Sequence, residues 1–286
     1  MCRLFITNRQ DFNNYDKRYG ILNLMNTLEK SCGGHGNGYL LVKGGKIEKA
    51  EKGIRLENPK IYKQVKREAW DYMIYHSRIA SVGNQSDANC HPFYNNIHNS
   101  ALAMNGTESG LKGLANGLGI TDTELIFRSI KSESAEKACK ILLELGSVFV
   151  GFGHNGVPYV VKDYGDLDLW RFGDKSFHAS EFPKNVKNTM KCPYDYVWID
   201  GQTNEIITKN KKKSVYYYNG GKYYDSFYDH NTTSFSTKYG TVAVDTDDDI
   251  ETPEDELWQA YEDGWNEGYS AGRESVEKEL LEDGGI

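Results

Sequence analysis

The segment MCRLFIT (residues 1–7) places a cysteine directly after the initiator methionine and at the head of an apolar strand pattern. Methionine aminopeptidase removes Met1 efficiently when the second side chain is as small as that of cysteine. Its removal would leave a thiol and a free α-amine on one residue. Because such an amine has an ordinary pKa of roughly 8, it can accept the thiol proton near neutral pH. Cys2 is therefore a candidate nucleophile that contains its own base, although a cysteine also occurs at this position by chance.

The residues that follow alternate between short apolar runs and segments with helical periodicity. Several runs are joined by Gly-containing turns, which favours antiparallel sheets with helices packed outside them. The predicted strands are residues 2–7, 38–42, 73–79, 101–104, 147–153, 158–161 and 196–199. The predicted helices are residues 19–30, 59–70 and 122–145.

Composition places limits on the class of protein. The 286 residues suffice for one large domain, or one domain with an appendage, and 38% of them are hydrophobic. The formal charge of -7 argues against nucleic acid as a direct ligand. No apolar run is long enough to span a bilayer, and the first residues lack the apolar stretch of a signal peptide. We therefore expect a cytoplasmic protein with no membrane contact.

The cysteines do not indicate a disulfide framework, because their number is odd and their spacing is irregular. No CxxC pair or regular histidine spacing supports a four-ligand zinc site, so no metal is expected. No motif indicates a cofactor. The cysteines are Cys2, Cys32, Cys90, Cys139 and Cys192.

A second motif is HSRIAS (residues 76–81), followed by NCHPF (residues 89–93). Arg78 ends an apolar strand, where burial of its charge is unfavourable unless a carboxylate meets it. A guanidinium can bind the α-carboxylate of an amino acid through two hydrogen bonds. An internal salt bridge explains the same residue equally well.

A third motif, AMNGT (residues 103–107), places Asn-Gly after an apolar strand. This pair is usually a hairpin turn. Alternatively, the Asn105 amide and the Gly106 N–H could both donate to an oxyanion. A fourth motif, TDTE (residues 121–124), begins a predicted helix, where Asp122 is either a routine cap or the acceptor of a substrate ammonium.

Together, and in this order, these motifs resemble the glutaminase domains of class II glutamine amidotransferases. GGHGNGY (residues 33–39) resembles the Gly-rich loop of that family, and FHASE (residues 177–181) resembles its late strand. The resemblance covers roughly residues 2–185. It implies an α+β fold of the N-terminal-nucleophile hydrolase type, a four-layer αββα sandwich of two antiparallel sheets.

The resemblance also implies roles for individual residues. Cys2 would be the nucleophile, with its own amine as base, and Asn105 with Gly106 would form the oxyanion hole. Neither histidine of the motifs would act as a general base.

On the substrate side, Arg78 would hold the glutamine α-carboxylate and Asp122 the α-amino group, with Ser81 also binding substrate. The chain departs from the family at Met104, where histidine is common, and at Val82, where sugar-amidating members often have histidine. These two positions shape the pocket more than they affect the chemistry.

The composition changes after about residue 200. We expect a glutaminase-like domain at 1–200, a Tyr-rich and acidic linker or extension at 201–252, and a C-terminal amphipathic helix at 253–282. That helix has an aromatic stripe and either docks on its own domain or forms a homo-oligomer or partner contact.

The resulting hypothesis is a stand-alone class II amidotransferase-like hydrolase, which releases ammonia from glutamine, or a similar small amide, through a Cys2 thioester. The region after Cys192 is too short and too low in complexity for a synthase, so a separate synthase subunit is expected to receive the ammonia. Two alternatives are an amidase of this fold that acts on another γ-glutamyl or acyl amide, and a non-catalytic binding or structural protein on the same scaffold.

Overall fold

The structure is a computed structural model that describes residues 2–163, 167–173 and 176–200 in full. Beyond residue 200 it describes the backbone of five further strands. The chain divides into two units, Met1–Ile207 and Thr208–Ile286, and each is described separately below.

The first sheet of the larger unit has seven antiparallel strands. They are β1 (Arg3–Asn8), β2 (Asn37–Lys43), β3 (Lys46–Gly53), β4 (Tyr72–Ser77), β9 (Trp170–Phe172), β10 (Phe177–Ala179) and β11 (Thr189–Lys191). Their order is β11-β9-β10-β1-β4-β2-β3. Side chains of β1 alternate, so Leu4 and Ile6 face the second sheet while Phe5 packs among the helices. The opening residues therefore form a strand that is buried on both faces.

The second sheet has six strands and is also antiparallel. They are β5 (Phe93–Asn95), β6 (Ser100–Asn105), β7 (Val148–Gly153), β8 (Val157–Lys162), β12 (Tyr196–Ile199) and β13 (Gln202–Asn204). Their order is β13-β12-β8-β7-β6-β5, so β6 and β7 pair although three helices separate them in sequence.

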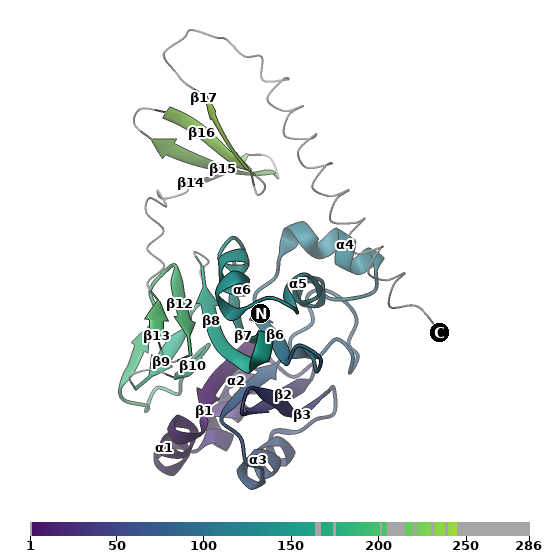
Figure 1. Ribbon diagram of the computed structural model, residues 1–286, viewed down its shortest axis with the longest axis vertical. Coiled ribbons are helices and arrows are strands. Elements are labelled where there is room, and N and C mark those ends of the chain that lie inside the picture. The colour runs from purple at the N-terminus through teal and green to yellow at the C-terminus, as the bar shows by residue number, and fades with distance from the viewer. Residues whose placement is uncertain are drawn as a thin grey trace. The chain divides into compact units, whose positions relative to one another are not determined.

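Helices cover the outer face of each sheet (Figure 1). The first sheet is covered by α1 (Arg9–Tyr19), α2 (Ile21–Cys32) and α3 (Asn58–Arg67), and the second by α5 (Asp122–Ile130) and α6 (Ala135–Leu142). Short elements complete the unit: η1 (Ser109–Leu111), α4 (Lys112–Gly117) and η2 (His154–Gly156).

The buried apolar side chains form three clusters, one for each interface between layers. Phe12 belongs to the cluster between the first helices and the first sheet, Trp198 to the cluster between the sheets, and Phe149 to the cluster under α5 and α6. All three side chains are fully buried, and each such burial stabilises the fold by about 1.5–3 kcal/mol or more. The predicted α+β fold, with an αββα sandwich of two antiparallel sheets, is confirmed.

Two predicted elements differ from the structure, and one helix was not predicted. The predicted helix 122–145 is two helices, because Ser134 begins α6 by accepting a hydrogen bond from the Lys137 N–H. Helix α1 was not predicted, because its sequence is mostly polar and only Phe12 and Tyr15 are buried. The strand predicted at 73–79 ends at Ser77.

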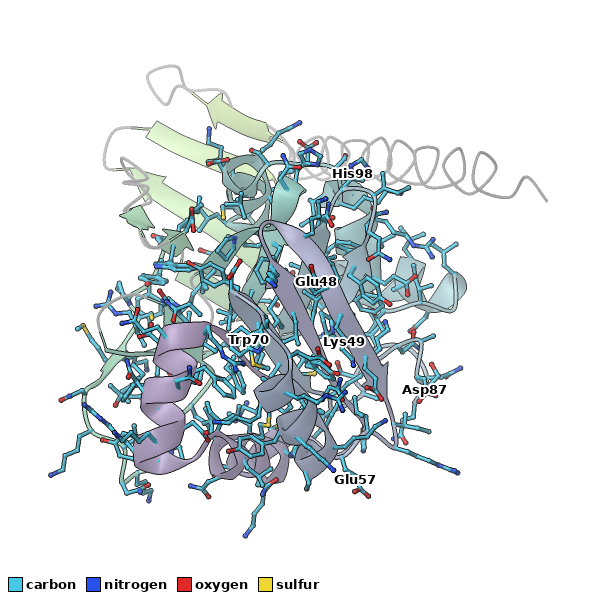
Figure 2. The ribbon with its side chains drawn as sticks, turned by 60° about the horizontal axis from the view of Figure 1, so that its bottom comes forward. Glu48, Lys49, Glu57, Trp70, Asp87 and His98 are labelled. Carbon is cyan, nitrogen blue, oxygen red and sulfur yellow. The ribbon has the colours of Figure 1, made fainter. Side chains whose placement is uncertain are left out.

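Strand β3 was also not predicted, because its sequence KIEKAEKG is rich in charge. It is the edge strand of the first sheet, and Figure 2 shows Glu48 and Lys49 on it. Charged side chains on an edge strand hinder pairing with another chain. The charged residues that make this strand hard to predict from hydrophobicity therefore suit its position at the edge of the sheet.

Two turns, one from each sheet, touch through their backbones at one end of the sandwich. A Cβ on Gly45 would lie 2.5 Å from the Asn155 oxygen, and a Cβ on Gly156 would lie 2.5 Å from the Gly45 oxygen. Both glycines have positive φ, so the contact requires glycine for space and for conformation. The strand register places this contact at the end of the sandwich remote from Cys2.

The smaller unit contains a four-stranded antiparallel sheet in the Tyr-rich stretch. Its strands are β14 (Val215–Asn219), β15 (Lys222–Asp229), β16 (Thr232–Thr237) and β17 (Gly240–Val244), and each pairs with the next along the chain. The helix predicted at 253–282 lies outside the described residues. Within the described residues, no helix has both the length and the hydrophobicity required to cross a membrane.

Candidate active site

Cys2 lies at the head of β1, beside the segment that follows β4. The register pairs Arg3 with Ser77, so the next residue outward, Cys2, lies opposite Arg78. The Cys2 Sγ is 3.4 Å from both the nitrogen and the oxygen of Ile79, and Cys2 is 5% exposed. Burial raises the pKa of Cys2 to about 11, opposed by the hydrogen bond from Ile79 and by the charge of Arg78. The thiol is therefore protonated at neutral pH and needs a base in order to react.

Arg78 is a buried cation that is held by carbonyl oxygens. Its guanidinium donates to Val82 O at 2.9 Å and to Asn84 O at 3.1 Å, and its backbone N–H donates to Gly36 O at 2.8 Å. No carboxylate of the described residues forms an ion pair with it, so the salt-bridge alternative is not what the structure contains. Burial lowers the pKa of Arg78, while Cys2 and Asp122 raise it.

The loop that follows Arg78, residues 79–90, is anchored on both sides. His35 Nδ1 accepts a hydrogen bond from the Ala80 N–H at 3.0 Å. Asp87, which Figure 2 labels beside the end of β3, accepts from the Ile54 N–H at 2.8 Å. These contacts fix the carbonyl groups that hold the Arg78 guanidinium.

Asn105 is the last residue of β6, and Gly106 comes directly after it. The next elements are η1 and α4, so this Asn-Gly pair is not a hairpin turn. Gly106 has a φ of +148, and a Cβ there would lie 2.1 Å from Ser147 Oγ, so only glycine fits. Asn105 is 1% exposed; its Nδ2 lies 3.4 Å from Ser180 Oγ, and its Oδ1 has no partner among the described residues.

Asp122 is a buried anion at the first position of α5. The helix cap is Thr121, whose hydroxyl accepts from the Glu124 N–H, so Asp122 is not the capping residue. Its two carboxylate oxygens accept from the N–H groups of Glu108 and Thr123, each at 2.9 Å. Burial raises the pKa of Asp122, while these hydrogen bonds and the charge of Arg78 lower it. No cation of the described residues forms an ion pair with it.

Hydrogen bonds join the two sheets around these residues. His76 Nε2 lies 3.1 Å from Met104 O, which connects β4 to β6 immediately before Asn105. Farther out, Ser81 Oγ and Thr107 Oγ1 are 2.8 Å apart, and both residues are exposed. The predicted substrate residue Ser81 therefore lies at the rim of the site.

The two motif histidines are buried and neutral. The rings of His76 and His91 lie 4.2 Å apart, and burial lowers the pKa of His76 to about 3. Burial also lowers the pKa of His91 well below its ordinary value, and the neighbouring His76 lowers it further. Neither ring is therefore charged at neutral pH, and both serve to pack the sheets together.

The structure brings Cys2, Arg78 and Asp122 within electrostatic reach of one another. Asn105 and Gly106 join them through Glu108, whose N–H binds Asp122. The arrangement brings a thiol, a cation and an anion close together, and the Asn105–Gly106 pair lies two residues before the Glu108 N–H that binds the anion. Such a set can bind a zwitterion and stabilise a negative oxygen.

Two supporting residues received no role from the motifs. Ser147 donates to Glu108 Oε1 at 2.6 Å and fills the space beside Gly106. Ser180 accepts from the Leu4 N–H at 3.1 Å and contacts Asn105. Ser147 and Ser180 lie far in sequence from their hydrogen-bond partners, so no local motif indicates these contacts. Ser180 belongs to the motif FHASE, but that motif assigned it no role. In the described ranges, no group of three or more His, Cys, Asp or Glu side chains is arranged to hold a metal ion.

Comparison with known proteins gives structural likenesses only. No family model and no curated protein matches the chain. Glutamine phosphoribosylpyrophosphate amidotransferase from B. subtilis is similar in structure, with a TM-score of 0.49 and 19% identity over 70% of this chain. This chain covers 47% of that protein, about half its length.

A glutamine aminotransferase class-II domain protein from Silicibacter pomeroyi is also similar, with a TM-score of 0.43 and 12% identity. That likeness covers 70% of this chain and 95% of the other. In the arrangement of its backbone, the chain is similar to these two proteins.

Proposed function

We propose that the protein hydrolyses the side-chain amide of glutamine with Cys2 as the nucleophile. The observation that supports this most strongly is a pair of opposite charges beside the thiol. Arg78 is 2% exposed and Asp122 is 4% exposed, and neither has an ion-pair partner among the described residues. Buried charges without partners are unfavourable, so their retention indicates a ligand that supplies the missing charges.

A free amino acid has the required charges. Its α-carboxylate can bind the Arg78 guanidinium, and its α-ammonium can bind Asp122. Each Asp122 oxygen accepts one backbone hydrogen bond and has a further lone pair for the ammonium. The side-chain amide would then extend toward Cys2, and Ser81 at the rim would contact the substrate from outside.

The chemistry proceeds in two steps. The α-amine of Cys2 takes the thiol proton, and the thiolate attacks the amide carbon while Asn105 Nδ2 and the Gly106 N–H donate to the oxyanion. The nitrogen leaves as ammonia after it receives the proton from the Cys2 amine. Water then hydrolyses the γ-glutamyl thioester, which yields glutamate and restores the thiol. The ammonia would pass to a separately encoded synthase, as in a class II amidotransferase.

This mechanism requires that Met1 is removed, because an amine bound in a peptide cannot accept a proton. The pKa of about 11 for the buried Cys2 thiol makes this requirement strict, since the thiolate is scarce at pH 7. The α-amine has an ordinary pKa of roughly 8, so it is a suitable base near neutrality. Activity should therefore rise as the pH increases through the pKa of that amine.

The test compares two forms of the same protein. In one form a tag is joined directly to Cys2, and in the other a site-specific protease has removed the tag so that Cys2 comes first. Each form is exposed to a diazoketone analogue of glutamine and weighed intact, and ammonia release from glutamine is measured in parallel. We expect one adduct per chain, and ammonia release, only in the cleaved form.

Equal turnover by both forms would place the base elsewhere, and absence of both adduct and ammonia in the cleaved form would support a non-catalytic role. A parallel assay with other γ-glutamyl and acyl amides separates the glutaminase from an amidase of the same fold. Preference for glutamine, with its free α-carboxylate and α-amine, is the expected result.

A further inference from the structure

Ser180 connects the nucleophile strand to Asn105. It lies directly after β10, and its backbone N–H donates to Leu4 O at 2.9 Å. Its hydroxyl accepts from the Leu4 N–H at 3.1 Å, so Ser180 holds both backbone groups of a residue two positions from Cys2. The same hydroxyl oxygen lies 3.4 Å from Asn105 Nδ2. Ser180 is 3% exposed, and solvent therefore does not compete for these contacts.

The hydrogen bonds of this group differ between the two orientations of the Asn105 amide. With Nδ2 toward Ser180, the Ser180 hydroxyl proton and the buried Asn105 Oδ1 both lack a partner among the described residues. With Oδ1 toward Ser180, the hydroxyl donates to Oδ1, and only the two N–H groups of Nδ2 lack a partner among the described residues. The two ends of an amide are assigned from the hydrogen bonds they make, so the second orientation is the favoured one.

We infer that Ser180 is a positioning residue that turns the Asn105 amide so that its nitrogen faces the developing oxyanion. The inference depends on the proposed function, because the oxyanion is that of the glutamine amide. In the favoured orientation Nδ2 no longer donates to Ser180, and both of its N–H groups are available to the substrate oxygen. Among the described residues, the hydrogen bonds of Ser180 are with Leu4 and Asn105.

This arrangement places a limit on the effect of Ser180. Loss of one oxyanion donor lowers turnover by about 10²–10³-fold. A residue that acts only by orienting that donor cannot have a larger effect than removal of the donor. We therefore expect Ser180→Ala to lower kcat by about 10-fold to 100-fold, with KM within about threefold of wild type.

The test is a double-mutant cycle of Ser180→Ala and Asn105→Ala in the mature full-length chain, with kcat and KM for glutamine as readouts. If Ser180 acts through Asn105, S180A lowers kcat in the wild-type background but changes it by less than about twofold in the N105A background. If S180A does not fold, Ser180→Cys, which retains a weak donor, replaces it in the cycle. An undiminished loss in the N105A background would overturn the inference.

A second readout separates Asn105 from Cys2, because Ser180 also binds the strand that begins at the nucleophile. The alkylation rate of Cys2 by iodoacetamide needs no oxyanion donor, and it should be equal in S180A and wild type. Ser100→Ala is the matched control, because Ser100 is a buried serine of β6 whose hydroxyl has no partner in the described residues. That control should retain wild-type kcat.

Equal losses in alkylation and in kcat would mean that Ser180 supports Cys2 and would overturn the inference. A wild-type chain without glutaminase activity would instead contradict the proposed function itself. The two failures are therefore distinguishable in one set of measurements.

Discussion

Two buried polar regions of the molecule differ in how their hydrogen-bonding groups are satisfied. The Asn37 network, formed by Glu29, Asn37, Asn58 and Tyr75, lies between the first helices and the first sheet. Glu29 accepts from Asn37 Nδ2 at 2.8 Å and from Asn58 Nδ2 at 2.9 Å. The Tyr75 hydroxyl lies 2.8 Å from Asn58 Oδ1 and 3.3 Å from Asn37 Oδ1.

In the Cys2 region the opposite holds. Arg78 and Asp122 are buried without an ion-pair partner in the described residues, and one end of the buried Asn105 amide also lacks a partner there. A satisfied network stabilises one conformation, whereas groups without partners lower stability unless a ligand completes them. We therefore propose that the first region serves the fold and the second serves binding.

The largest effect is expected at the nucleophile. Replacement of Cys2 by alanine removes the atom that forms the thioester, so turnover should fall by at least about 10⁴-fold. Ammonia release and adduct formation with the diazoketone measure this loss. Cys139→Ala is the control, because Cys139 is a buried cysteine of α6 in another cluster of the core. Comparable turnover in C2A and wild type would show that the Cys2 region is not catalytic.

The next effect separates binding from stability at Arg78. Arg78→Met should lower kcat/KM for glutamine by about 10²–10³-fold, because the α-carboxylate loses its partner. The free energy of unfolding should change by less than about 1 kcal/mol, because a buried charge without a counter-charge is replaced by an apolar chain. Enzyme kinetics and denaturant titration check both values. A large loss of stability with unchanged kinetics would mean that the Cys2 region serves the fold and does not bind a ligand.

Asp122 offers a narrower test of the same comparison. Asp122→Asn should lower kcat/KM for glutamine by about 10-fold to 100-fold, because the amide lacks the charge that attracts the α-ammonium. Wild type should strongly prefer glutamine to N-acetylglutamine, and this preference should decrease in the variant. Competition between the two substrates measures it, and an unchanged preference would contradict the role of Asp122.

The Cys2 region and the Asn37 network differ in how far the sequence predicts them. Motifs predicted roles for Cys2, Arg78, Asn105 and Asp122, because nucleophile, charge and turn chemistry need particular residue types at particular places. They did not separate Ser81 at the rim from the buried residues, because exposure follows from how the loops fold. Asn37 lies in the Gly-rich motif GGHGNGY, but nothing in the sequence indicated the network, since its members are ordinary polar residues that meet only when α2, α3 and the first sheet pack together.

A smaller effect concerns the neutral histidines between the sheets. Burial lowers the pKa of His178 to about 3, below its unfolded value of roughly 6.5. The unfolded chain therefore binds more protons between these two values, so the stability present above pH 6.5 falls as the pH decreases toward 3. At pH 5 the loss should be about 2 kcal/mol for this residue.

Denaturant titration at pH 7.5 and pH 5 measures this loss. His178→Gln keeps a polar group near the Tyr196 hydroxyl, which lies 2.7 Å from His178 Nε2, but it cannot take up the proton. The variant should therefore lose less stability between the two pH values than wild type. Equal losses would show that His178 is not responsible.

The smallest effect is expected in the Asn37 network. Tyr75→Phe removes the hydroxyl that donates its one proton to the side-chain oxygen of Asn58, the nearer of the two amide oxygens, which should lower the free energy of unfolding by about 1–2 kcal/mol. Because the network lies on the helix side of the sheet, kcat/KM should stay within about twofold of wild type. Thermal unfolding and steady-state kinetics check the two parts. A change in kcat/KM of more than about twofold would show that the Asn37 network also affects turnover, and would remove the distinction between the two regions.

The glycine contact at the remote end of the sandwich bears on how the proposed activity could be changed in the laboratory. Gly45 and Gly156 let the two turns meet through bare backbone, and this contact joins the two sheets at that end. The first sheet carries Cys2 at its opposite end and the second carries Asn105, and the strands between are roughly 20 Å long and stiff. Under the proposed function, a directed-evolution library at the residues that flank these two glycines would therefore tune the spacing of nucleophile and oxyanion donor while the residues around the substrate stay unchanged.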